Sequence, residues 1–427
     1  MTMDKSASEI LKPLLKQTED YLNQKLIPFW VERAVEPKHG GFQSNYDKDG
    51  NRTEVTEKSF LSQVRSIFTI SHAMRQGFDW PNGKEAVKQG IDFLQKYFHD
   101  KEYDGYYWIV EEDGTPKDMN KIIYGHSFLI YGFSEYALLT GDNAAKEEAI
   151  RIFNLLQDKV ADKEYGGYYE HFDRAFNLKQ ARGDIKAHKS LDVHLHLMEA
   201  FTTLYELTGE EVHRKALTDV IDLIFDKMIE PSTGTGISMF TDRWEPISNV
   251  ELDTVWGSDR FDDDGKSTDI TSYGHNIEFA WLYLHSQDIL GIPREKGLDR
   301  VVPIYEHTYK NGVDWNYGGI YVEGERTGKY TEGTKEFWQQ AEALIGFLDA
   351  YSVTKDKRYL DAYLNIHNFV FSKGINWELG EWYALLDEKG NLKWDYMGTS
   401  WKVFYHTVRG TCQIVNRMKR LINESKK

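Results

Sequence analysis

A glycine–aromatic turn recurs six times along the chain, and this repeat restricts the fold more than any other feature. The turns are marked by Gly41, Gly105, Gly167, Gly236, Gly319 and Gly380. Successive markers lie 64, 62, 69, 83 and 61 residues apart. Near-regular spacing of this kind indicates a repeated supersecondary unit, and about 60 residues can hold two helices with their connections. The chain is therefore predicted to consist of six similar units.

The segments between the turns have the apolar periodicity of helices. Helices that precede a turn are amphipathic with a charged face, which predicts an outer position, whereas those that follow a turn are less charged and are expected inside. We predict an all-α chain with one domain over 1–427, an (α/α)6 barrel of six helical hairpins with short strands or turns in the connections. A linear solenoid of helix pairs is the alternative. The predicted helices are 10–30, 58–74, 84–97, 122–139, 145–160, 188–207, 211–228, 273–290, 300–309, 336–351, 358–371 and 401–422.

One interval is longer than its neighbours. Between Gly236 and Gly319 the excess of roughly 15–20 residues lies in an acidic stretch, 245–271. Long connections within a regular repeat are usually functional or disordered. We expect an inserted loop that forms a wall or lid over the mouth of the barrel, although a solvated acidic insertion remains the simpler interpretation.

Composition excludes several classes of partner. The net charge of −16 argues against nucleic acid or an anionic membrane. No apolar run is long enough to span a membrane, and the first residues lack the apolar core of a signal peptide. Cys412 is the only cysteine, so no intrachain disulfide can form, and a reducing cytoplasm is expected. Aromatic residues make up 14% of the chain, which suits a carbohydrate site where flat rings stack on sugars.

The stretch 189–200 carries polar groups inside an otherwise apolar helix. Asp192 and His196 are four residues apart and share a helix face, whereas His194 points away from it. Buried polar groups need hydrogen-bond partners, so specific groups are expected opposite them. Polar or aromatic side chains on other predicted inner helices complete the candidate set: Arg65, Tyr124, His275, Glu278, Trp338, Glu342, Trp401 and His406.

Three histidines, His196, His275 and His406, lie near the starts of corresponding inner helices, so a ring of these helices would bring their imidazoles together. Such groups move protons near neutral pH, and carboxylates one helical turn away can orient them. A lone core histidine or a structural ion pair of Arg65 would be the ordinary interpretation of each residue alone. A metal site is the competing use of clustered histidines, but no HExxH motif or ligating cysteine pattern is present, and we predict no metal or other cofactor.

Four motifs carry a resemblance to a known family. They are His-Leu-His-x-x-Glu-Ala at 194–200, Ser-Tyr-Gly-His-Asn-Ile-Glu at 272–278, Gln-Ala-Glu-Ala-Leu-Ile-Gly-Phe at 340–347 and Trp-Lys with Tyr-His at 401–406. The chain resembles the N-acylglucosamine 2-epimerase superfamily, in particular its cellobiose 2-epimerase and D-mannose 2-epimerase branch. The resemblance extends over nearly the whole chain, and it implies an (α/α)6 barrel that epimerises aldoses at C2 without metal or nucleotide.

Several departures from the disaccharide-epimerase pattern favour free sugars. Asp192 stands where those enzymes resemble each other in having Asn, His126 replaces Gln, and Val403-Phe404 replaces Gly-Pro. The loop 245–271 is an addition, and by resemblance to the mannose-acting branch Asp253 is expected near Arg65. We therefore expect a D-mannose/D-glucose 2-epimerase, with cellobiose 2-epimerase and mannose–fructose isomerase as alternatives.

By this resemblance His406 removes the C2 proton and His275 returns one to the opposite face, while Arg65, His196 and Tyr124 stabilise a cis-enediolate. Glu278 and Glu342 are expected to hold the imidazoles, and Trp338 and Trp401 to stack on the sugar. A glycoside hydrolase or lyase on the same barrel would need two opposed carboxylates, and a silent sugar-binding protein is a further alternative. A sugar is the only expected partner of a monomer or homodimer.

Overall fold

The computed structural model describes residues 5–179, 186–247 and 268–424. Helices dominate these residues, as the apolar periodicity predicts. Six of the described helices follow the repeated turns, and we call them inner helices. They are α3 (Phe60–Arg75), α5 (Ile123–Thr140), α7 (Leu191–Thr208), α9 (Tyr273–Leu290), α11 (Phe337–Thr354) and α13 (Gly410–Glu424), the last preceded by a π-helical turn, η9 (Tyr405–Arg409).

The inner helices are buried around most of their circumference. Every residue of α7 from Leu191 to Leu204 is buried, although this helix includes acids and histidines. In the outer helix α8 (Glu211–Leu223), by contrast, the buried residues recur every three or four positions, which is one helix face. The other outer helices are α1 (Lys5–Tyr21) with α2 (Ile27–Val31), α4 (Gly83–Phe93), α6 (Asn143–Leu155), α10 (Leu298–His307) and α12 (Lys357–Phe369).

The outer helices share a π-helical turn at the end that leads into the glycine turn. After α1, α4, α6, α8, α10 and α12, these segments are η1 (Leu22–Leu26), η2 (Leu94–Phe98), η3 (Leu156–Val160), η4 (Ile224–Met228), η7 (Thr308–Gly312) and η8 (Val370–Gly374). A short 3-10 helix, η6 (Arg294–Gly297), precedes α10. The repeat visible in the sequence is thus repeated in backbone conformation.

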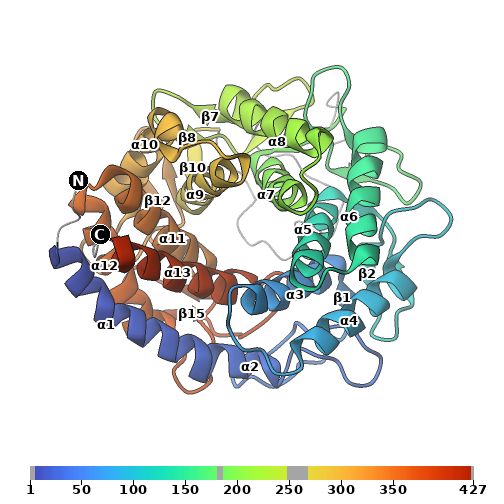
Figure 1. The fold of residues 1–427 in the computed structure, drawn as a ribbon, viewed down its shortest axis with the longest axis horizontal. Coiled ribbons are helices and arrows are strands. Elements are labelled where there is room, and N and C mark those ends of the chain that lie inside the picture. The colour runs from blue at the N-terminus through green and yellow to red at the C-terminus, as the bar shows by residue number, and fades with distance from the viewer. Residues whose placement is uncertain (1–4, 180–185, 248–267, 425–427) are drawn as a thin grey trace.

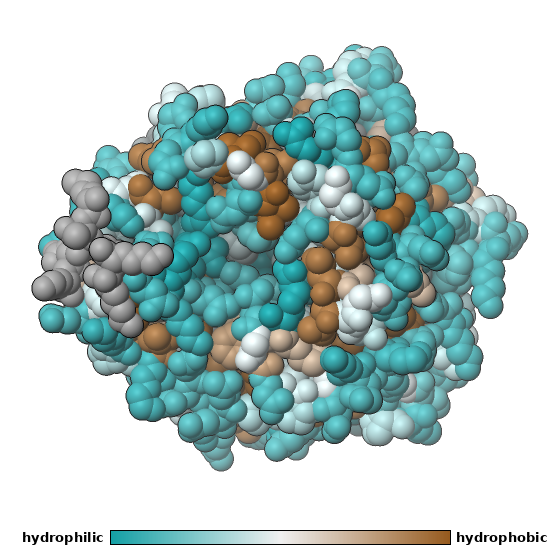
Figure 2. Space-filling model, viewed as in Figure 1, coloured by the Kyte–Doolittle hydropathy of each residue, from teal (hydrophilic) through white to brown (hydrophobic). Residues whose placement is uncertain are grey.

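The inner helices form a closed ring (Figure 1). Contacts run from α3 to α5, α7, α9, α11 and α13 in turn, and η9 contacts α3. The first and last units therefore meet, as they would not in a linear solenoid. Each inner helix also packs against one outer helix, and α13 packs against α1, so the two ends of the chain together make the sixth pair. Figure 2 shows a hollow at the centre of the ring, bordered largely by hydrophilic residues.

Short strands connect each unit to the next. The strand before an inner helix pairs antiparallel with the strand that follows the next glycine turn, as in β1 with β2, β4 with β5, β10 with β11 and β13 with β14. The bridge between Tyr46 and Gly398 makes the corresponding connection between the first and last units. The strands before α9 are β1 (Lys58–Ser59), β2 (Ile109–Val110), β3 (Pro116–Asp118), β4 (Lys121–Ile122), β5 (His171–Phe172), β6 (His188–Ser190), β7 (Ile229–Glu230), β8 (Thr235–Gly236), β9 (Met239–Thr241) and β10 (Ile270–Ser272).

The remaining strands are β11 (Glu323–Glu325), β12 (Tyr330–Glu332), β13 (Lys335–Glu336), β14 (Leu385–Leu386) and β15 (Leu392–Trp394). β1-β2-β3, β10-β11-β12 and β13-β14-β15 are three-stranded sheets, and the pairs β4 with β5, β6 with β9 and β7 with β8 lie between the first and the second of them in the chain. These sheets stand beside the N-terminal ends of the inner helices.

A buried lysine ties the start of an inner helix to a glycine turn, and we call this contact the lysine tie. Lys335 Nζ lies 2.6 Å from Asp314 Oδ2, and neither side chain is exposed. Asp314 also accepts hydrogen bonds from two backbone N–H groups of the turn, so its charge is fully partnered. The lysine ties among the described residues are Lys58–Glu36, Lys121–Asp100, Lys189–Asp162, Lys335–Asp314 and Lys402–Glu381.

A polar side chain five residues after each lysine makes a second connection. Gln340 Oε1 accepts a hydrogen bond from Ile320 N at 2.8 Å, and His194 Nε2 accepts one from Tyr168 N at 3.0 Å. His126 does the same for Tyr106 N. At Gly167 a β-carbon would lie 2.8 Å from His194 Nε2, and φ is +77°, so only glycine fits this turn. His194 is therefore held away from the axis of the ring, as predicted.

Several predicted boundaries need correction. Residues 58–59, 122, 188–190 and 336 were expected to open inner helices but belong to β1, β4, β6 and β13. Residues 401–404 precede the helical segment that begins at Tyr405. Pairing with a neighbouring strand determines the conformation of the residues that form strands, and helical periodicity does not detect that pairing. The expected loop 245–271 lies mostly outside the described residues, and its last two residues belong to β10. None of the described helices is both long and apolar enough to cross a membrane.

Replacing Lys335 with Met should destabilise the fold by about 3–5 kcal/mol, because the buried Asp314 would lose its cation. Urea unfolding of the variant measures this change. The exposed pair Lys215–Asp219 offers a matched control, since Lys215→Met should change the free energy of unfolding by no more than about 0.5 kcal/mol.

The double variant Lys335→Met/Asp314→Asn should recover much of the loss. Asn keeps the acceptor for the turn but carries no charge, and Asn376 already fills the corresponding position of the sixth unit, where it accepts from Glu378 N. Equal destabilisation by the Lys335 and Lys215 variants would refute the structural importance of the lysine tie.

Candidate active site

Polar side chains gather where the first turns of the inner helices meet. Counting seven residues from each tie lysine, or from Thr271 in the fourth unit, reaches one level of the ring. Except for Phe128, the residues at this level are charged or titratable: Arg65, His196, Glu278, Glu342 and Arg409. All of them are buried. The repeat thus places one polar layer across the ring, just inside the ends that bear the sheets.

His196 lies between two carboxylates. Its Nδ1 is 3.0 Å from Glu199 Oε2, and its Nε2 is 3.3 Å from Asp192 Oδ1. Burial would lower the pKa of His196, but the hydrogen bonds of Asp192 and Glu199 outweigh it and raise that pKa to about 9. His196 is therefore an imidazolium at neutral pH, suited to donating to an anionic oxygen rather than to removing a proton.

His406 has the opposite electrostatic environment. Its Nδ1 lies 2.7 Å from Glu342 Oε1. Burial, followed by the positive charges of Arg65 and Arg409, holds the pKa of His406 well below its ordinary value. The imidazole is consequently neutral, and an Nδ1–H donated to Glu342 leaves Nε2 as a lone-pair base.

His275 and His406 contact the same indole. The Trp338 ring centroid lies 4.7 Å from that of His275 and 5.5 Å from that of His406. His275 comes from α9 and His406 from η9, so the two imidazoles approach Trp338 from different helices. His275 Nε2 is also 3.4 Å from Asp192 Oδ1. Asp192 therefore stands between the imidazoles of His196 and His275.

Glu278 departs from its predicted role. We expected Glu278, one helical turn after His275, to hold that imidazole. The carboxylate that lies beside the His275 imidazole is instead Asp192, from α7. Glu278 Oε1 instead accepts from Arg409 at 3.3 Å. Burial, followed by the charge of Glu342, raises the pKa of Glu278 well above its ordinary value. Because Glu342 accepts from Trp281, Arg409 and His406, the proton of this pair is best placed on Glu278.

Arg409 and Glu199 are residues that the sequence reasoning missed. Arg409 is fully buried and donates to Glu199 at 2.7 Å, and also to Glu278 and Glu342. Tyr405 Oη donates to Glu199 as well. The signal was available, because Glu199 belongs to the motif at 194–200 and Arg409 keeps the seven-residue offset from its tie lysine. Glu278, Glu342 and His406 could in principle hold a metal ion, but Arg409 already supplies the cation there, and a second would be repelled.

Arg65 carries a charge that no carboxylate neutralises among the described residues. Its guanidinium donates to Tyr124 Oη at 2.7 Å and to the Trp401 carbonyl at 3.2 Å. It also lies over the rings of Phe128 and Tyr405, at 4.5 and 4.9 Å from their centroids. The salt bridge considered for Arg65 from sequence is absent from this part of the chain. Asp253, the expected neighbour, lies outside the described residues.

Trp401 contacts the ring of Tyr124 at the site and the ring of a second tryptophan, Trp108. Trp401 lies 6.1 Å from the Tyr124 ring and 6.4 Å from the Trp108 ring. The Tyr124 ring in turn meets His196 edge-on at 5.0 Å. The predicted site residues that the structure describes therefore come together. Asp192 contacts His196 and His275, Trp338 contacts His275 and His406, and Tyr124 joins His196 to Arg65 and Trp401.

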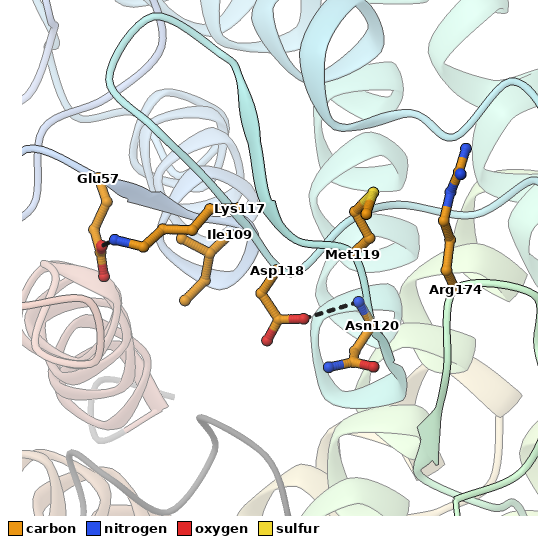
Figure 3. A pocket seen from close by; sticks show the side chains of 7 residues that line it. All are labelled: Glu57, Ile109, Lys117, Asp118, Met119, Asn120 and Arg174. Carbon is orange, nitrogen blue, oxygen red and sulfur yellow. Dashed lines mark hydrogen bonds and ion pairs between the residues drawn. The ribbon is translucent and has the colours of Figure 1, made fainter.

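A cavity of about 470 Å³ lies beside the sheet β1-β2-β3. In Figure 3 the side chains of Asp118 and Asn120 extend to the same side of the chain, while Met119 points the other way. Asn120 is four residues before Tyr124, so the two lie at most about 14 Å apart along an extended chain. The cavity is lined by Glu57, Ile109, Lys117, Asp118, Met119, Asn120 and Arg174.

Comparisons with known proteins identify the family of the chain. The family model for N-acylglucosamine 2-epimerase (GlcNAc 2-epimerase) matches residues 40–410. Cellobiose 2-epimerase of Bacteroides fragilis is 28% identical over 94% of this chain and 97% of its own length. D-mannose isomerase of Marinomonas mediterranea is 24% identical over 91% of this chain and 94% of its own length.

A solved structure has the same fold. That of cellobiose 2-epimerase from Spirochaeta thermophila superposes with a TM-score of 0.85 at 28% identity, covering 98% of this chain and 99% of that one. The matched segment 40–410 contains all the described site residues from Arg65 to Arg409. The chain therefore belongs to the N-acylglucosamine 2-epimerase family and is an isomerase, an epimerase by its family.

Proposed function

We propose that this protein is a sugar 2-epimerase that interconverts D-mannose and D-glucose without a metal or other cofactor. One observation carries the proposal: two imidazoles from different helices, His275 and His406, approach the same Trp338 ring. Inversion at C2 requires one group to remove a proton from one face and another to return it to the opposite face. The closed ring of helix pairs, which we interpret as an (α/α)6 barrel, holds these groups on separate rigid elements.

The reaction begins when the sugar ring opens and C1 becomes an aldehyde. Neutral His406 then removes the C2 proton through Nε2, and a cis-enediolate forms. Its negative charge falls next to Arg65 and the His196 imidazolium, both of which are oriented before the substrate arrives. His275 delivers a proton to the other face of C2 and inverts its configuration. The two imidazoles exchange roles in the reverse direction.

Other side chains position these groups. Glu342 fixes the tautomer of His406, and Asp192 orients both His275 and His196. Protonated Glu278 lies beside Arg409 and leaves the carboxylate of Glu342 to orient His406. Trp338 and Trp401 offer flat faces for the apolar side of the sugar.

A 4-O-linked disaccharide is the second candidate substrate, and the cavity beside β1-β2-β3 favours it. Its volume of about 470 Å³ is within the range of small-molecule sites, and Asp118 and Asn120 can hydrogen-bond a second sugar unit. Two of the departures from the disaccharide-epimerase sequence pattern no longer count as evidence for free sugars. His126 makes the same type of bond as Gln340, and Phe404 packs against Trp30. Asp192 remains the departure that touches the site.

Replacing either base should stop epimerisation. In His406→Asn or His275→Asn, kcat should fall about 10²–10⁴-fold, because general acid–base catalysis by a positioned side chain is worth that much. Proton NMR of D-mannose in heavy water measures both loss of the C2 hydrogen and the products. Fructose as the dominant product would identify an aldose–ketose isomerase, since the proton would then reach C1.

His126→Gln is the matched control for the loss of an imidazole. Gln occupies the equivalent positions 63 and 340 and keeps the hydrogen bond to the turn, so this variant should retain most of the activity. Full activity in either base variant would end the two-base proposal.

Activity should decline as the pH rises through about 9. The folded pKa of His196 is raised from 6.5 to about 9, so its positive charge persists at neutral pH and is lost above that value. Asp192→Asn removes one of the two carboxylates responsible and should shift this alkaline limb of kcat/KM to lower pH. An alkaline limb at the same pH in both proteins would exclude His196 as the stabilising cation.

Variants of the cavity distinguish the two candidate substrates. Asn120→Ala should raise KM for cellobiose up to about 10-fold, the worth of one hydrogen bond, and leave KM for D-mannose unchanged if a second sugar binds there. Asp219→Ala, on the outer helix α8, is the surface control. An unchanged KM for cellobiose would remove the cavity from the substrate path.

A further inference from the structure

A second group of titratable side chains lies outside the active site. Glu170, His171 and His188 are each buried, with 2–3% exposure. His171 opens β5 and His188 opens β6, so the two imidazoles come from different strands. The proposed reaction does not use these residues, and their sequence spacing matches none of the motifs that carried the family resemblance.

The three side chains converge. Taking one ligand atom from each residue, these atoms all lie within 4.8 Å of one another. His188 Nε2 is 3.0 Å from Glu170 Oε2, and the two imidazole centroids are 5.0 Å apart. Two imidazole nitrogens and a carboxylate oxygen form the ligand set His₂Glu, which binds zinc in proteins. Imidazole ligands also disfavour Mg²⁺ and Ca²⁺, which prefer oxygen.

We propose that Glu170, His171 and His188 form a zinc-binding site, with the fourth position open to water. Zinc ligands lie about 2.0–2.2 Å from the metal, so tetrahedral ligands are roughly 3.3–3.5 Å apart. The Glu170–His188 pair, at 3.0 Å, is a few tenths of an ångström closer than this separation, and His171 completes the site by moving no more than about 1.5 Å. An imidazole at the end of a two-torsion side chain can cover that distance.

The second oxygen of Glu170 orients the site. Glu170 Oε1 accepts a hydrogen bond from Ser190 N, and Ser190 is the N-cap of α7, where its hydroxyl accepts from Val193 N. Such hydrogen bonds to a ligating carboxylate are typical of metal sites. The proposed zinc would tie β5 to β6, immediately before the helix that carries Asp192 and His196. Its role would be to stabilise that connection, and it would take no part in the chemistry at C2.

The ordinary alternative is a buried trio without metal. In it Glu170 pairs with His188 and accepts from Ser190 N, and the His171 ring packs beside that of His188. The two interpretations differ in one respect, because only the first predicts affinity for zinc that depends on all three side chains. Activity of the enzyme does not enter this difference, so the zinc proposal can fail while the proposed epimerase reaction stands, and the reverse also holds.

The experiment uses the full chain without a histidine tag. After treatment with a chelator, the protein is dialysed against micromolar ZnCl₂, and bound zinc is measured by mass spectrometry. We expect one equivalent per chain. Thermal unfolding should shift to higher temperature with zinc, because a ligand at 100-fold its Kd favours the folded state about 100-fold. His171→Gln and His188→Gln should each lose the bound zinc and the shift.

His99→Gln is the matched control, since His99 pairs with Asp104 on the surface, where their side chains are 30% and 38% exposed. This variant should keep both the bound zinc and the shift in unfolding temperature. Zinc bound equally by the His171 and His188 variants, or no zinc bound by the unaltered chain, would overturn the proposal. If the variants do not fold, anomalous diffraction at the zinc edge from the unaltered chain decides. A peak between the three residues supports the site, and a peak elsewhere or none refutes it.

Discussion

The lysine tie is the interaction on which the arrangement of this protein depends. In each of the five ties found in the described residues, a buried ammonium at the start of an inner helix is neutralised by a carboxylate near a glycine turn. A buried charge must be paired, so the helix cannot slide along its axis without leaving that charge exposed to an apolar interior. In the fourth unit Thr271 and Asn276 reach Gly236 with neutral hydrogen bonds instead. The ties bring the inner helices to a common level.

Because the inner helices start at a common level, residues at the same number of positions after a tie residue lie in one layer across the ring. Because Arg65, His196, Glu278, Glu342 and Arg409 are all seven residues after a tie position, they meet across the ring although 344 residues separate the first from the last. The layer mixes cations and anions. Arg409 joins Glu199, Glu278 and Glu342, and His196 joins Asp192 and Glu199. Such a network is costly to bury unless its charges are paired, and this pairing holds each group in one orientation before a substrate binds.

Two buried histidines, His196 and His406, thereby acquire opposite properties. His196 is surrounded by carboxylates, which raise its pKa to about 9. His406 shares its surroundings with two arginines, and its pKa is lowered. Both rings are buried, so burial alone would have made both neutral. The partners that neighbouring helices supply decide which ring is an electrophile and which can be a base. The same principle distinguishes His194 and His126 from His196 and His406, because backbone groups bind the ring nitrogens of His194 and His126.

The sequence by itself determined the number of units, the inner and outer character of the helices and most members of the site, because these follow from glycine spacing, apolar periodicity and motifs that are local in the chain. It also indicated correctly that His194 and His196 face different ways, since that follows from helical periodicity alone. Only the tertiary structure decided which carboxylate serves which imidazole: Asp192, rather than Glu278, reaches His275. It also revealed Arg409 at the centre of the acids and the convergence of His171 with His188. These pairings join residues on different helices or strands, and their distances depend on how the units pack, which no periodicity within one segment encodes.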